Sequence, residues 1–71
     1  MEKEKSVVLI YDSEEKLLRF VNLDHFSEAR FYLNGDIEIY ECTIWCNNKY
    51  VKTSDPESIE KIKSYFESKC I

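Results

Sequence analysis

Three cysteines and one histidine give this sequence a possible ligand set for a zinc ion. Cys42 and Cys46 stand four positions apart in the segment ECTIWC, Cys70 is the penultimate residue, and His25 is the single histidine. Three thiolates and one imidazole are a known ligand set for tetrahedral zinc. Whether these side chains can meet depends on the elements that carry them.

The segment around Cys42 and Cys46 is rich in β-branched and aromatic residues and therefore favours a strand. Residues four positions apart in a strand lie on one face, but roughly 13 Å from each other. Two sulfur ligands of one zinc ion lie within about 4.6 Å of each other, because each Zn–S bond is about 2.3 Å long. We therefore expect no metal and no cofactor. The three cysteines, Cys70 included, are predicted to be free thiols in or near the core rather than zinc ligands or redox groups.

The other polar residues form no recognisable catalytic pattern. His25 follows Asp24, which could orient an imidazole, but no nucleophile motif accompanies the pair. Glu14 and Glu15 are adjacent in a charged turn, where carboxylates usually point into water. The single glycine excludes the glycine-rich phosphate loops of nucleotide-binding folds. We predict that the protein is not an enzyme.

The composition is that of a small folded domain with an acidic surface. The chain has 71 residues, of which 44 % are hydrophobic and 14 % aromatic, and its net charge is −4. Eight acidic and three basic residues fall between positions 11 and 41. Acidity opposes phosphate binding and favours solubility or a basic protein partner. We divide the chain into a frayed polar segment, 1–5, and one small domain, 6–71.

Targeting signals are not evident in the sequence. The beginning of the chain, MEKEKSVVLIYD, has too short an apolar run for a signal peptide, and no segment approaches the ~20 apolar residues of a membrane span. We therefore expect a cytoplasmic protein without membrane contact, in which free thiols are the usual state.

The fold is predicted to be α+β, with an antiparallel β-meander of four to five strands followed by one C-terminal α-helix packed on the sheet. Two short strands begin it, SVVLIY (6–11) and LLRFVN (17–22), joined by the turn-like DSEEK. In the helix, Pro56 suits the first turn, and Ser54 with Glu57 matches a capping box. The apolar stripe of the helix consists of Ile59, Ile62, Phe66 and Cys70, with Tyr65 at its flank.

The segment FYLNGDIEIY predicts a β-hairpin, because Asn-Gly between two apolar runs marks a tight turn. A three-residue loop, Leu33-Asn34-Gly35, gives a register with apolar pairs on one face and an ion pair on the other. The predicted pairs are Phe31 with Ile37, Ala29 with Ile39, and Arg30 with Glu38. A helix from Asp24 to Gly35 is the alternative. It would leave the following strand without a sequential hairpin partner.

The strand after this turn changes its apolar face partway along. Its apolar residues are first Ile37 and Ile39, and then Tyr40, Cys42, Ile44 and Cys46. A β-bulge near Tyr40–Cys42, or a bend between two layers, would reconcile the two patterns. A turn at CNNK and a last strand, YVKT (50–53), complete the sheet.

One segment has a likeness elsewhere. FVNLDHFSEARFY, together with GDIEIY, resembles a pattern in small bacterial and phage-type proteins, in which such a stretch precedes two strands and a helix. It covers about a third of the chain. The resemblance implies no catalytic residue and no specific function.

Aromatic residues on neighbouring strands are the strongest candidates for a binding surface, although they could equally complete the core. We predict a partner-binding site made of Tyr32, Glu38, Tyr40, Trp45 and Tyr50. Tyr and Trp anchor protein interfaces, which favours a small acidic protein-interaction module, a regulator or inhibitor of the kind that phages and mobile elements encode. The alternative is a single-stranded nucleic-acid-binding protein that stacks bases on these rings, assisted by Lys49 and Lys52.

The first strand raises the question of self-association. Five successive apolar residues, Val7 to Tyr11, must place side chains on both faces of the sheet, and one helix covers only one face. Either a curled sheet or a second copy of the chain has to cover the other. We favour a homodimer that hides Val7, Leu9 or Tyr11.

Overall fold

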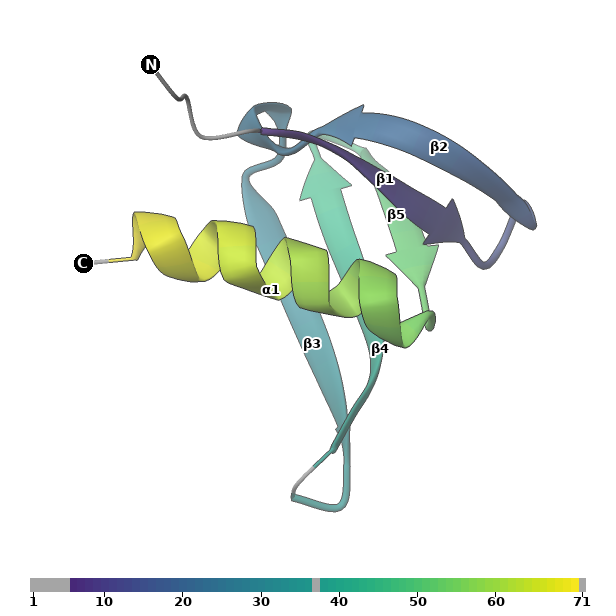
Figure 1. Cartoon of the computed structure of the whole chain (residues 1–71). Helices are drawn as coiled ribbons and strands as arrows, with labels where there is room; N and C mark the ends of the chain where they lie inside the picture. Colours follow the sequence, from purple (N-terminus) through teal and green to yellow (C-terminus); the bar gives the residue numbers. More distant parts are fainter. Residues whose placement is uncertain (1–5, 37, 71) are drawn as a thin grey trace.

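A computed structural model describes residues 6–36 and 38–70 of the chain. The elements in chain order are β1 (Val7–Asp12), β2 (Leu17–Asn22), the 3₁₀ helix η1 (Leu23–His25), β3 (Glu28–Asn34), β4 (Glu38–Cys46), β5 (Lys49–Thr53) and α1 (Pro56–Lys69) (Figure 1). The α+β class and the C-terminal helix are confirmed. Within the described ranges, no helix is long and apolar enough to cross a membrane.

The strands form two antiparallel sheets, which differs from the single meander expected from the sequence. β1 pairs with β2, and β3, β4 and β5 form a second sheet in that order. Between them η1 makes a tight turn, in which the Asn22 side chain accepts a 3.0 Å hydrogen bond from the Asp24 amide and Leu23 is fully buried. This turn redirects the chain before β3 begins, so β2 and β3 do not pair. The alternative helix from Asp24 to Gly35 is also excluded, because helical structure in this segment is limited to Leu23–His25 and β3 follows it.

β1 is covered along both of its edges. One edge pairs with β2. Along the other edge α1 supplies side chains: the Ser58 hydroxyl accepts a 2.8 Å hydrogen bond from the Tyr11 amide, and Lys61 Nζ donates to the Leu9 carbonyl at 3.0 Å. These bonds satisfy backbone groups that a free edge would expose. β2, in contrast, pairs with no other strand among the described residues.

The β3–β4 hairpin has a different register from the predicted one. The observed pairs are Phe31 with Cys42, Ala29 with Ile44, Arg30 with Thr43, and Asn34 with Glu38. Ile37, one of the residues in the predicted pairs, lies outside the described residues. Leu33 and Asn34 belong to β3 rather than to the loop, and Gly35 follows them with a φ of 73°. The observed pairing brings the apolar residues of β3 opposite the most buried part of β4, so burial and not the turn alone selects the register.

The predicted bulge in β4 is confirmed. The register shifts between Tyr32 and Leu33, which leaves Tyr40 as an extra residue on β4. Ile39 and Cys42 are three positions apart and would face opposite sides of a regular strand. With the extra residue between them, both pack in the same core.

α1 begins at a different cap from the predicted one. Asp55 is the N-cap and accepts a 3.0 Å hydrogen bond from the Ser58 amide, with Pro56 at the start of the helix as expected. The Ser54 amide instead donates to Ser13 Oγ at 2.8 Å. That bond ties the β1–β2 turn to the start of the helix. The predicted capping box of Ser54 and Glu57 is wrong, because Asp55 is the N-cap.

The apolar stripe of α1 is confirmed over most of its length. Ile59 and Ile62 are buried, and Phe66 packs against the margin of the core. Cys70, however, is exposed, which corrects its predicted place in the core. It is the C-cap residue, and its amide donates to the Glu67 carbonyl at 3.1 Å. Helical periodicity predicts the side of a helix that faces inward, but not where along the helix the core ends.

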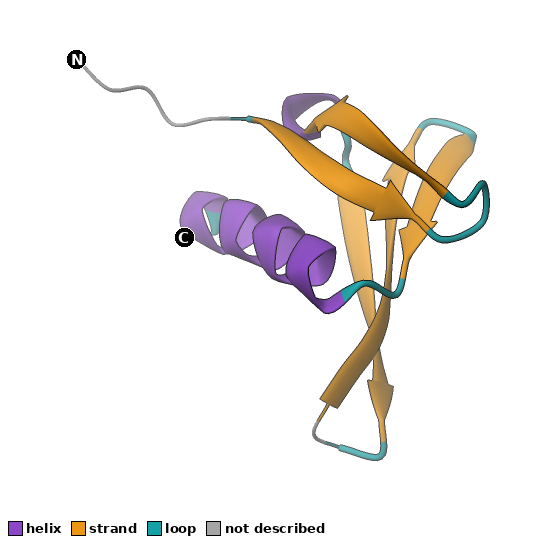
Figure 2. Ribbon diagram, turned by 45° about the vertical axis from the view of Figure 1, so that its right-hand side comes forward, coloured by secondary structure: helices purple, strands orange, loops and turns teal. Residues whose placement is uncertain are grey.

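The core lies between the two sheets and α1. In Figures 1 and 2, α1 runs across the three-stranded sheet and the β1–β2 ribbon lies over one end of it. The buried apolar residues are Ile10, Val21, Leu23, Cys42, Ile44, Val51, Ile59 and Ile62. Each large side chain among them contributes about 1.5–3 kcal/mol through burial. The opposite side of the three-stranded sheet carries no further layer of the described chain.

A candidate binding face on the three-stranded sheet

The three cysteines differ in burial, and in the part of the chain that the structure describes they do not gather with the histidine into a metal site. Cys42 and Cys46 are both in β4, as predicted, and residues 6–36 and 38–70 contain no group of three His, Cys, Asp or Glu that could hold a metal. Burial raises the pKa of the Cys42 thiol to about 12, so this thiol is protonated at neutral pH. His25 is exposed, and its neighbour Asp24 accepts a hydrogen bond from the Tyr65 hydroxyl of α1.

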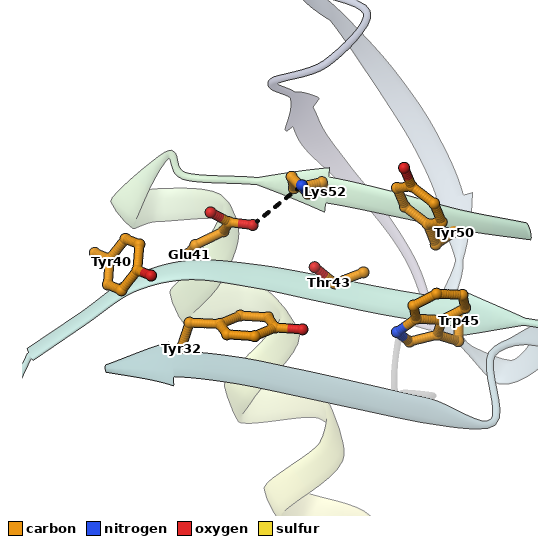
Figure 3. Close-up of a pocket in the computed structure, with 7 residues that line it drawn as sticks. All are labelled: Tyr32, Tyr40, Glu41, Thr43, Trp45, Tyr50 and Lys52. Carbon is orange, nitrogen blue, oxygen red and sulfur yellow. Dashed lines mark ion pairs between the residues drawn. The ribbon is translucent and has the colours of Figure 1, made fainter. Parts of the chain in front are cut away.

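An open hollow of about 370 Å³ lies on the side of the three-stranded sheet that faces away from α1 (Figure 3). We call this surface the aromatic face. The residues that line it are Tyr32, Tyr40, Glu41, Thr43, Trp45, Tyr50 and Lys52. Tyr32, Tyr40 and Tyr50 are 38 %, 52 % and 43 % exposed, so these rings do not complete the core.

Strand alternation explains why these residues share a side. Thr43 pairs with Lys52, and Trp45 pairs with Tyr50, and directly opposed residues of an antiparallel pair project to the same face. Thr43 is 3 % exposed and forms the floor between the flanking rings (Figure 3). The bulge adds Tyr40 to the same surface. The shift in register that buries the apolar residues of β4 therefore also widens the aromatic face.

The two rings at one end of the face are in contact. The Trp45 and Tyr50 ring centroids are 5.0 Å apart, and their planes are tilted by 49°. The Arg30 guanidinium lies over the indole, 5.1 Å from its centroid. The Tyr50 hydroxyl donates to a Glu14 carboxylate oxygen at 3.2 Å, so the β1–β2 turn helps to fix this ring. These contacts preorganise the aromatic surface.

One polar group of the face has no partner. The Trp45 indole nitrogen is shielded from solvent and has no hydrogen-bond partner among the described residues. In Figure 3 this nitrogen is on the side of the indole nearer to Tyr32. A shielded N–H without an acceptor is costly, and an incoming carbonyl oxygen would satisfy it. Because the nitrogen is shielded, such an oxygen could reach it only after the surrounding side chains shift.

The cations of the face are paired with carboxylates. Lys52 Nζ lies 3.5 Å from Glu41 and 4.0 Å from Glu14, and the charge of Glu41 is the main cause that raises the pKa of Lys52. Arg30 Nε lies 2.8 Å from Glu28. That hydrogen bond, followed by one to Tyr32, raises the pKa of Arg30. Exposed ion pairs of this kind add little stability. They do, however, place a carboxylate beside both Arg30 and Lys52.

The structure brings together most of the predicted partner-binding residues. Tyr32, Tyr40, Trp45 and Tyr50 all line the hollow, whereas Glu38 lies at the far end of β4, where it pairs with Asn34. Lys49, named for the nucleic-acid alternative, does not line the hollow, but Lys52 does.

Sequence reasoning missed Glu41 and Thr43 as members of the face. Their signal was alternation with Trp45 in β4: the three residues stand at every second position after the bulge. A polar, small and aromatic residue in that order does not by itself distinguish a binding surface from an ordinary solvent-facing side of a sheet.

Comparison with known proteins adds no relative. No family model matches the chain, and neither the curated proteins nor the solved structures contain a significant match. Any function for this chain therefore has to follow from the chemistry of its own surfaces.

Proposed function

We propose that the protein is a small protein-interaction module that binds a polypeptide segment of a partner on its aromatic face. The observation that carries this proposal is the meeting of Tyr32, Tyr40, Trp45 and Tyr50 in one open hollow. Tyr and Trp are the residues most enriched at binding hot spots, because they combine a large apolar area with a polar group. The side chains come from paired strands, which hold them in fixed relative positions.

The polar groups of the hollow suit a peptide backbone. The Tyr hydroxyls and Thr43 can donate or accept, and the Trp45 N–H can only donate. A polypeptide offers amide donors and carbonyl acceptors at regular intervals, so it can satisfy both kinds of group. A purely apolar ligand would leave the Trp45 N–H without an acceptor.

The charge of the module suits a partner with basic residues around the bound segment. Glu14, Glu28 and Glu41 border the aromatic face, and the whole chain has a net charge of −4. Complementary charge accelerates association and disfavours acidic competitors. Binding of this kind could block or regulate a partner by covering its surface, which is the role of an inhibitor or regulator. Three free thiols fit a reducing compartment such as the cytoplasm.

One observation favours single-stranded nucleic acid as the second candidate. Trp45 and Tyr50 are neighbouring rings on a sheet surface, with Arg30 and Lys52 beside them, and bases stack on such rings. Phosphate contacts would, however, require both cations to leave their carboxylates. We therefore rank this candidate below a protein partner.

The experiment is quantitative affinity capture from cells with the immobilised protein and two variants. Tyr40→Ala with Tyr50→Ala removes two exposed rings of the aromatic face, and Leu33→Ala removes a side chain of similar exposure outside the hollow. We expect a partner that the wild type and the Leu33 variant retain and that the double variant loses.

Fluorescence anisotropy with single-stranded DNA and RNA at low salt tests the second candidate. Tight binding that weakens steeply with salt and is lost in the double variant would replace the proposal with the nucleic-acid function. Equal capture by all three proteins would contradict both assignments to the aromatic face.

A further inference from the structure

The β1–β2 sheet has a second apolar surface, separate from the aromatic face. In its register Leu9 is opposite Phe20, and Tyr11 is opposite Leu18. Opposed residues share a face, and so do residues two positions apart along a strand. One face of the ribbon, which we call the ribbon face, therefore carries Val7, Leu9, Tyr11, Leu18 and Phe20, with the polar but uncharged Asn22 at its end.

The other face of the same ribbon is already buried. Ile10 and Val21 project into the core and are 1 % and 8 % exposed. On that side Arg19 reaches Asp12, with 3.5 Å between Nε and the carboxylate. The ribbon face thus points away from the core, and Val7, Leu18 and Phe20 on it are 52 %, 63 % and 74 % exposed.

We propose that the ribbon face is the contact surface of a symmetric homodimer, in which the β1–β2 sheets of two copies pack face to face. The first reason is charge. Each copy has a net charge of −4 and would repel a second copy across most of its surface, but the ribbon face contains no charged residue. A two-fold contact sets a surface against itself, so a charge-free apolar surface is the one that can pair without repulsion.

The second reason is area. A large side chain presents about 150–250 Å² when fully exposed, so the exposed parts of this face amount to roughly 400–500 Å² in one copy. Two such faces bury roughly 800–1,000 Å² together, which lies at the low end of protein interfaces and fits a weak dimer that forms in a concentration-dependent way. Edge-to-edge pairing of β2 with β2 of a second copy would leave these side chains in water, so face-to-face packing accounts for the patch.

The dimer has a consequence for the aromatic face. Both surfaces point away from the shared core, one from each sheet, so dimerisation leaves the hollow open in both copies. A partner with two binding segments would then gain affinity through the second contact, because that contact becomes intramolecular. The dimer itself does not depend on the identity of that partner.

Sedimentation equilibrium of the full chain over a range of micromolar concentrations tests the dimer. We expect a mass that rises with concentration from 8.5 kDa toward twice that value. Phe20→Lys and Leu18→Lys, each at an exposed position, should hold the mass at the monomer value, with far-UV circular dichroism checking that both remain folded. Leu33→Lys, at a position 52 % exposed on β3, is the matched control and should dimerise like the wild type.

Two results would overturn the proposal. One is a wild-type mass of 8.5 kDa at every concentration. The other is a dimer that survives both Lys substitutions on the ribbon face, in particular if Tyr40→Lys on the aromatic face dissociates it.

Discussion

The aromatic face and the ribbon face are both exposed and rich in apolar side chains, yet they differ in chemistry. The aromatic face is a hollow, with hydroxyls, an indole N–H and paired charges among its rings. The ribbon face is an uncharged row of aliphatic and aromatic side chains on a two-stranded ribbon. Polar groups at fixed positions discriminate between ligands, whereas an uncharged apolar surface favours close packing with little discrimination. We therefore propose recognition for the three-stranded sheet and self-association for the β1–β2 sheet.

The two surfaces depend on one core, and breaking that core gives the largest expected effect. Ile44 is fully buried in β4, behind the aromatic face, and packs in the same cluster as Ile10 of β1. Ile44→Ala should cost about 2–5 kcal/mol of unfolding free energy and Ile44→Val about 0.5–1.5 kcal/mol. Urea denaturation at a fixed protein concentration measures both.

Loss of Ile44 should impair partner binding and dimerisation together. Leu33→Ala, on the exposed part of the same sheet, is the control and should change stability little. If Ile44→Ala were as stable as the control, the common core of the two sheets would be wrong.

A pair of surface variants should separate the two activities. Tyr40→Ala with Tyr50→Ala should weaken partner binding by about tenfold or more, because Tyr is among the residues whose truncation most often costs above 1 kcal/mol at an interface. The same variant should dimerise normally. Phe20→Lys should do the reverse, keeping the affinity of a single site while abolishing the dimer. Isothermal titration calorimetry and sedimentation measure the two effects, and a variant that impaired both equally would remove the distinction between the faces.

The sequence predicts the elements better than their pairing. β2 matches LLRFVN, and β1 is shifted by one residue from the expected SVVLIY. The N-cap of α1 is one residue from the expected Ser54, and the bulge near Tyr40 follows from the change of apolar face in β4. These features are encoded locally, in runs of about six residues or in a helical period. The β3–β4 register is not, because the Asn34-Gly35 signal indicates that a turn exists but not where the loop begins. Burial of Cys42 and Ile44 opposite β3 decides it, and that requires the whole core.

The candidate site was predictable in its residue types and not in its shape. Four of the five predicted partner-binding residues line the hollow, since aromatic residues on neighbouring strands must lie near one another. Glu38 was misplaced together with the register, because the predicted pairing set it opposite Arg30 rather than Asn34. The split into two sheets depends on the turn at Leu23, whose burial no local pattern reveals. The second apolar face of β1, in contrast, was expected from the run Val7 to Tyr11, and the structure adds Leu18 and Phe20 to it.

The three thiols should differ in reactivity in the order of their exposure. Cys70 is exposed, Cys46 is half-buried and Cys42 is buried, with the pKa of Cys42 raised to about 12 from an ordinary 9.0. A disulfide reagent near neutral pH should label Cys70 first and Cys42 only after unfolding. Mass spectrometry of the labelled protein measures this order, with Cys42→Ser as the control.

The same thiol makes the stability depend on pH in the alkaline range. In the unfolded chain Cys42 ionises near 9.0, whereas in the folded protein it holds its proton up to about 12. The unfolded state therefore loses its proton first, and stability falls as pH rises through this window. Cys42→Ser should flatten that part of the curve of unfolding free energy against pH. In the labelling experiment, early modification of Cys42 at neutral pH would contradict its burial in the core.

The smallest expected effect is that of metal removal. Because Cys42, Cys46 and Cys70 differ in burial and Cys42 and Cys46 lie along one strand, a chelator should leave the thermal unfolding midpoint unchanged. Metal analysis of the purified protein should give less than one zinc per chain. A midpoint that collapses with the chelator would show that β4 does not run unbroken between Cys42 and Cys46.

Hydrogen–deuterium exchange with the captured partner tests the central assignment most directly. The protein alone and the protein saturated with partner are compared segment by segment, under conditions in which both are dimeric. Binding on the aromatic face predicts slower exchange in Glu38–Cys46 and Lys49–Thr53, the strands that carry most of the hollow. Slower exchange confined to Val7–Asp12 and Leu17–Asn22 would place the partner on the ribbon face and contradict the division of roles between the two sheets.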